Sequence, residues 1–119
     1  MRISDYYQPF EKKIIIAVTN NASARLLSAF DRDIEEIEII NADESEEQLI
    51  ELYNSLHTRL RHLIANDGFT EAIVCIPEVN KTLFTELLPA DMKKQISDIV
   101  PKNLASMDIP HIVRILLEG

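Results

Sequence analysis

Histidine and cysteine side chains bind metal ions and act in catalysis, and this chain of 119 residues has three histidines and one cysteine. His57 and His62 stand five positions apart in a segment with helical periodicity. Five steps of about 100° place them roughly 140° apart around a helix, whereas a shared metal ion needs a spacing of about four. Cys75 lies inside an apolar run, where nothing nearby in the sequence would stabilise a thiolate. We therefore expect no metal site, no cofactor and no catalytic residue.

Carboxylates would be needed for a second kind of chemistry, two-metal catalysis, which places acids inside or at the ends of central strands. The two most apolar runs, residues 14–18 and 72–76, contain neither Asp nor Glu. Glu71 and Glu78 flank the second run, and a single flanking acid is typical of a solvated strand end. The sequence therefore argues against a metal-dependent nuclease. It also excludes a glycine-rich phosphate loop, because Gly68 and Gly119 are the chain's two glycines.

Two groups of polar residues are candidates for binding. One is a basic group near the end of a predicted helix, which can neutralise acids on a neighbouring element or contact phosphates. The other group, Asn20, Asn21 and Glu78, directly follows two apolar segments. If the protein were a hydrolase, these residues would have to surround a pocket with convergent polar groups. The candidate residues are Asn20, Asn21, Arg59, Arg61, His62 and Glu78.

The acidic residues are concentrated between positions 31 and 47. This segment has nine acids and one base, so it accounts for the whole formal charge of −8, and the rest of the chain is neutral. Such a segment could bind a divalent cation or a basic partner, but it lacks the glycine and the regular oxygen spacing of a calcium loop. We interpret it as a solvated strand face followed by a helix start. The overall charge argues against free-standing DNA binding.

The first forty residues predict a short arm and three antiparallel strands. Residues 1–11 form the arm, and residues 12–19 are a β-branched strand that ends at Asn20 and Asn21, where positive φ would allow a tight turn without glycine. Residues 22–30 then run back. Residues 34–40 alternate, so Ile37 and Ile39 are expected on a buried face.

A long helix is expected next, with Ser45 and Gln48 as its capping box. Its apolar positions recur at helical spacing, and the pattern stops at residues 66–68. Residues 72–76 predict a central strand covered on both faces, ended by Pro77. A helix capped by Asn80, a helix over residues 90–97, a short extended piece at 99–100 and a helix over 109–118 complete the chain. This order predicts a single α/β domain, residues 1–119, with a mixed sheet in a ribonuclease-H-like three-layer arrangement.

The segment from residue 69 to 104 resembles the closing part of the bacterial host-attachment protein family, which is itself similar to the middle domain of archaeo-eukaryotic peptide-chain release factors. The resemblance rests on an apolar strand that runs into Pro77, a helix ending at Leu88, a helix containing Lys93 and Lys94, and a short strand before Leu104. It implies a release-factor-like domain whose partner is the ribosome, an RNA–protein surface or a protein.

In release factors, the loop before the long helix carries a Gly-Gly-Gln that positions water against the peptidyl-tRNA ester. The corresponding residues here, 41–47, contain neither glycine nor glutamine, so the resemblance implies a non-catalytic relative. The lone cysteine and the absence of a basic apolar leader favour the cytoplasm and no membrane association. Two alternatives stay open: an uncharacterised hydrolase, and a homo-oligomeric interaction module that uses the aromatic arm, Ile115 and Leu117.

Overall fold

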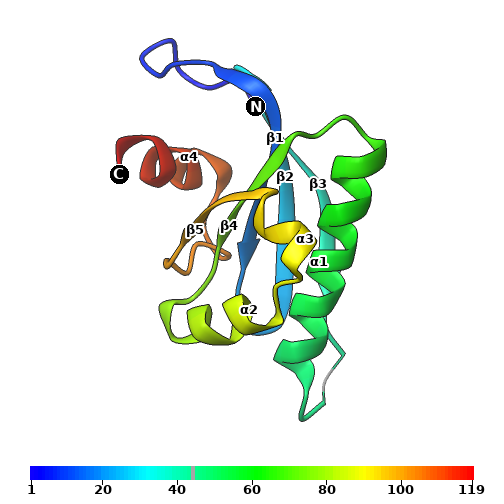
Figure 1. The fold of residues 1–119 in the computed structure, drawn as a ribbon. Coiled ribbons are helices and arrows are strands. Elements are labelled where there is room, and N and C mark those ends of the chain that lie inside the picture. The colour runs from blue at the N-terminus through cyan, green and yellow to red at the C-terminus, as the bar shows by residue number, and fades with distance from the viewer. Residues whose placement is uncertain (44) are drawn as a thin grey trace.

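A computed structural model describes residues 1–43 and 45–119. Glu44, which belongs to the predicted acidic segment, lies outside the described residues. One five-stranded sheet carries helices on both sides (Figure 1). The elements are β1 (Phe10–Thr19), β2 (Ser23–Asp31), β3 (Asp33–Asn41), α1 (Gln48–Asn66), β4 (Glu71–Cys75), the 3₁₀ turn η1 (Glu78–Asn80), α2 (Lys81–Leu87), α3 (Ala90–Lys93), β5 (Ile96–Val100) and α4 (Ile109–Glu118).

The sheet is mixed, in the order β3-β2-β1-β4-β5. The first three strands form an antiparallel meander, as predicted, with Val18 opposite Arg25 and Ala24 opposite Ile40. The long helix then crosses over, so that β4 pairs with β1 in parallel, and β5 pairs with β4 in parallel. The most apolar strand, β1, takes the central position, where its side chains are covered on both faces of the sheet.

Each face of the sheet has its own apolar core. Alternate side chains of β1 point to opposite faces, so Ile15 and Ala17 pack on the side of α1 and α2, whereas Ile14 and Ile16 pack on the side of α4. Helices therefore lie on both sides of the sheet, which confirms the predicted α/β fold (Figure 1). Among the described residues, no helix is long and apolar enough to cross a membrane.

The third strand differs from its predicted pattern because a β-bulge interrupts it. Leu26 lies opposite Glu38, and Leu27 lies opposite Glu36, so Ile37 has no partner on β2. Beyond the bulge every side chain changes face. Ile37 and Ile39 are therefore 44% and 51% exposed, and the prediction that they are buried was wrong.

Three local details also differ from expectation. Ser45 does not cap α1, whose first residue is Gln48 and whose N-cap is Glu47 without a side-chain hydrogen bond. The helix predicted over residues 90–97 ends at Lys93, because the chain from Ile96 onward pairs with β4 as a full strand. The turn after β1 does not use positive φ, which among the described non-glycine residues occurs at Asp31.

Candidate functional site

The ends of β1 and β4 bring Asn20, Asn21 and Asn80 together. The two strands are parallel neighbours, and the chain leaves them in opposite directions, toward β2 and toward β5. In open α/β sheets, such a point outside the carboxyl ends of the strands is where ligands usually bind. The asparagine side chains, however, are used to hold the local structure. Asn20 Oδ1 accepts hydrogen bonds from the backbone N–H groups of Ala22 and Ser23, at 2.8 and 2.7 Å.

Asn21 connects this turn to two helices. Its Oδ1 accepts a hydrogen bond from Asn80 Nδ2 at 2.7 Å, and its backbone carbonyl accepts one from Gln48 Nε2 at 3.0 Å. The side chain expected to complete a capping box therefore ties the start of α1 to the turn instead. Asn80 was expected to cap α2 and makes no side-chain cap hydrogen bond there. Glu78 lies at the start of η1, exposed to solvent.

Beneath this junction lies a buried group of polar side chains that sequence reasoning missed. Tyr53 and His57 of α1 pack against Phe84 of α2, with ring centroids 5.3 and 4.8 Å from the Phe84 ring. The Tyr53 hydroxyl and both ring nitrogens of His57 have no hydrogen-bond partner among the described residues. Thr19, at the end of β1, is buried beside them and donates its hydroxyl to the carbonyl of Cys75 at 3.2 Å.

Burial determines the protonation states in this group. It lowers the pKa of His57 to about 4, and the nearby charge of Arg61 acts in the same direction, so the ring is neutral at pH 7. Burial also raises the pKa of Tyr53. Helical spacing does contain the signal for His57, since it follows Tyr53 by four positions and precedes Leu60 by three on the buried stripe.

Cys75 is buried on the opposite face of the sheet. Burial, followed by the charge of Asp98, raises the pKa of its thiol to about 12. The thiolate is therefore scarce at neutral pH, and the side chain packs as a small apolar group. No cluster of three or more His, Cys, Asp or Glu residues that could hold a metal ion occurs in the described part of the chain.

The basic candidates on α1 separate into two directions. Arg59 Nε contacts both carboxylate oxygens of Glu38 on β3, at 2.9 and 2.8 Å. Arg61 binds the carboxylate of Asp91 on α3 through Nε and Nη2, which lowers the pKa of Asp91. The Nδ1 atom of His62 lies 3.2 Å from the Nδ2 atom of Asn66, one turn further along the same helix. Arg59 and Arg61 therefore point away from each other, and each neutralises an acid on a neighbouring element.

A groove of about 570 Å³ runs between α1 and β3. Glu38 and Ile40 form its strand side, and Arg59 and His62 lie on its helix side. Three small polar side chains of α1 leave the space open: Asn54, Ser55 and Thr58. Sequence reasoning missed this groove because its position depends on the bulge in β3, which decides that Glu38 and Ile40 face the helix.

Comparison with known proteins identifies structural neighbours but no sequence relatives. No family model matches the chain, and no curated protein matches it. Solved structures do match. They include the archaeal translation termination factor aRF1, with a TM-score of 0.57 and 18% identity over 72% of this chain. A model of ribosome-bound archaeal Pelota with ABCE1 matches over 88% of the chain, with a TM-score of 0.62 and 14% identity.

Dom34 of S. cerevisiae, described as a translation termination-like factor involved in RNA quality control and interacting with Hbs1, also matches. Its TM-score is 0.60, with 9% identity over 89% of this chain. The present chain spans 29–33% of the length of these proteins, and at such low identity the likeness establishes the fold alone.

Proposed function

We propose that this chain is a non-catalytic, release-factor-like domain that binds the ribosome or another RNA–protein surface in the cytoplasm. The observation that supports the proposal is the match over 88% of the chain to Pelota, described as ribosome-bound. We retain the likeness to the host-attachment family as part of this proposal. Residues 1–119 would then act as one domain.

The absence of peptide release is the second part of the proposal. Release factors use a Gly-Gly-Gln before the long helix, whereas the connection between β3 and α1 in this chain has no glycine. Gln48, the nearest glutamine, is the first residue of α1 and donates to the carbonyl of Asn21. We therefore expect this chain not to hydrolyse peptidyl-tRNA on ribosomes from which a true release factor does release the peptide.

The charge distribution favours one face for contact with RNA. The acidic segment, residues 31–47, would repel phosphates, so the contact should lie elsewhere. Arg61 on α1 and the exposed Lys93 and Lys94 at the end of α3 provide cations away from that segment. The Arg61 side chain is 46% exposed, so it can contact a partner despite its ion pair with Asp91.

Sedimentation with purified ribosomes over a salt series tests the proposal. We expect a bound fraction at low salt that falls as salt rises, because phosphate contacts release counterions. Arg61→Gln should reduce this fraction. Arg114→Gln, the same change on α4 across the sheet, is the matched control and should preserve it. The absence of a ribosome-bound fraction at the lowest salt would refute the proposal.

A further inference from the structure

The outer edge of β3, the side that faces away from β2, already accepts a short strand from the chain itself. The Met1 amino group donates to the Ile34 carbonyl at 2.7 Å, and the Ile34 N–H donates to the Met1 carbonyl at 2.8 Å. The Ile3 N–H donates to the carbonyl of Arg32 at 2.7 Å. Arg2 thus lies opposite Asp33 in an antiparallel bridge, and Ile3 is 2% exposed. A basic residue next to an apolar one therefore fits this edge.

Beyond Ile34 the outer edge is open. Ile34 directs its N–H and C=O groups outward, to Met1, whereas Ala42 directs its N–H inward, to Ala22. The two residues are an even number of positions apart, so an uninterrupted strand would direct both the same way; the unpaired Ile37 accounts for the change. Alternation then turns the backbone groups of Glu36, Ile39 and Asn41 outward. In the described part of the chain, no strand pairs with them on that side.

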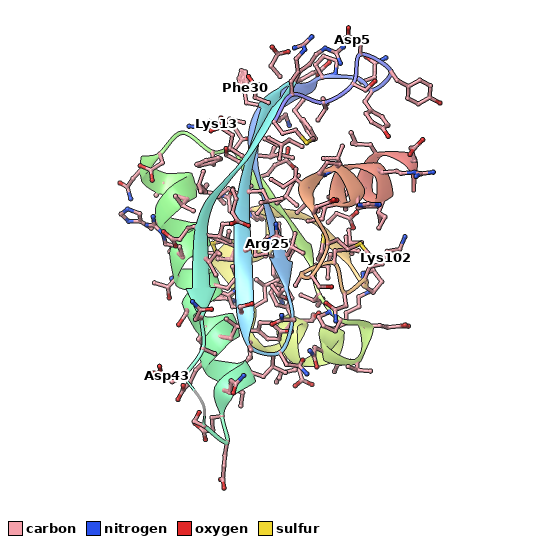
Figure 2. The ribbon with its side chains drawn as sticks, turned by 180° about the vertical axis from the view of Figure 1, so that it is seen from behind. Asp5, Lys13, Arg25, Phe30, Asp43 and Lys102 are labelled. Atoms are coloured by element: carbon pink, nitrogen blue, oxygen red, sulfur yellow. The ribbon has the colours of Figure 1, made fainter. Side chains whose placement is uncertain are left out.

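Apolar surface lies on both sides of this open edge. Ile37 and Ile39 are half-exposed, and the groove between β3 and α1 adjoins the edge with Ile40 in its wall. Figure 2 shows β3 as the outer strand beside α1, with Asp43 near the end of the open edge. An added strand would place alternate side chains in the groove and over the exposed isoleucines.

Charge determines which strand fits. Asp33, Glu35 and Asp43 are exposed and form no ion pair in the described part of the chain. A second copy of β3 would place these acids against their equivalents, and like charges on facing strands are destabilising. A strand with cations at alternate positions would instead bring opposite charges to these acids. Arg2 shows that a basic residue fits opposite Asp33 in the backbone bridge, while its guanidinium pairs with Asp5 and leaves the Asp33 carboxylate without an ion pair among the described residues.

We propose that residues 36–41 of β3 bind an extended segment of a partner protein in which lysine or arginine alternates with β-branched apolar residues. The backbone of the segment pairs with the outer edge, and its side chains occupy the groove and the isoleucine surface. This site is separate from the proposed ribosome contact, since it lies in the acidic segment and is tested without ribosomes.

Fluorescence anisotropy with two labelled synthetic peptides tests the proposal. The probe alternates lysine and valine over eight residues, and the comparison peptide alternates glutamate and valine. Glu35→Lys removes an unpaired acid beside the edge, and Glu86→Lys makes the same change in charge at an exposed site on α2. Ile39→Pro removes an outward N–H, a position at which an edge strand tolerates proline. Circular dichroism confirms that each variant is folded.

We expect saturable binding of the lysine peptide that weakens with salt, and little binding of the glutamate peptide. Glu35→Lys and folded Ile39→Pro should each weaken binding by roughly tenfold, whereas Glu86→Lys should leave it near wild type. Equal binding by wild type and Glu35→Lys would overturn the proposal. So would equal binding of both peptides, or a wild-type dimer in light scattering that the lysine peptide does not dissociate.

Discussion

Replacing His57 should remove most of the loss of folding stability that its protonation causes between pH 6.5 and pH 4. In the folded chain, burial holds the pKa of His57 at about 4, against 6.5 for an ordinary histidine. The unfolded chain therefore takes up a proton as the pH falls below 6.5, and the folded chain does not until about pH 4. The contribution of neutral His57 to the free energy of unfolding is therefore fully present above pH 6.5, the pKa in the unfolded chain. It is lost as the pH falls toward about 4, the pKa in the folded chain. At about 1.4 kcal/mol per pKa unit, the loss is roughly 3 kcal/mol.

Urea unfolding of wild type and His57→Leu, followed by circular dichroism between pH 4 and 7.5, measures this contribution. Leucine fits the apolar contacts with Phe84, and no hydrogen bond is lost, because neither ring nitrogen of His57 has a partner among the described residues. The variant should be at least as stable as wild type at pH 7. Below pH 6.5, wild type should lose stability relative to the variant by roughly 3 kcal/mol.

The matched control is His62→Leu, which makes the same change at an exposed position of α1 and should preserve the wild-type pH dependence. Comparing variants removes the contribution of carboxylates, which titrate in the same range in all three proteins. If the stability curves of wild type and His57→Leu were parallel from pH 7 to pH 4, His57 would not be buried as described, and the reasoning would fail.

Three further results are expected. Cys75 should react with a thiol reagent only after unfolding, because it is buried and its pKa is raised to about 12; fast reaction of the native protein would contradict this. Asn80→Ala should cost about 1 kcal/mol in urea unfolding, since a bond to the β1–β2 turn is lost, whereas exposed Asn103→Ala should cost little. Arg59→Gln should lower stability by less than about 1 kcal/mol at low salt, because its pair with Glu38 is partly exposed.

The elements with a strong period could be predicted from the sequence. The β-branched run of β1 indicated a strand, the apolar run of β4 indicated a strand covered on both faces, and the leucines of α1 indicated a helix with one buried stripe. Burial of apolar side chains provides most of the favourable free energy of folding, and it is recorded locally in the residue types, so these patterns are reliable guides. The mixed sheet then followed from two short antiparallel connections and one long crossover.

Details that depend on a distant partner could not be predicted. The segment after Lys93 had helical character, but pairing with β4 makes it a strand. Gln48 had the spacing of a capping residue, yet its amide reaches Asn21, which is far away in the sequence. Spacing in the sequence cannot distinguish this long-range contact from a helix cap, because either arrangement would give the side-chain amide of Gln48 a hydrogen-bond partner. The candidate site was affected most, since its residues come from the turns and helix ends where these contacts form.

The bulge in β3 shows how one residue can decide which side chains form a surface. Without it, the alternation that begins at buried Ile34 would place Ile37 and Ile39 toward α1 and Glu38 toward α4. The unpaired Ile37 shifts the pattern, so Glu38 reaches Arg59 and Ile40 joins the core, while Ile39 is left exposed at the edge. A bulge of this kind needs no glycine and leaves no mark in the sequence. The groove and the open edge therefore have a common cause, and a partner strand that uses one would contact the other.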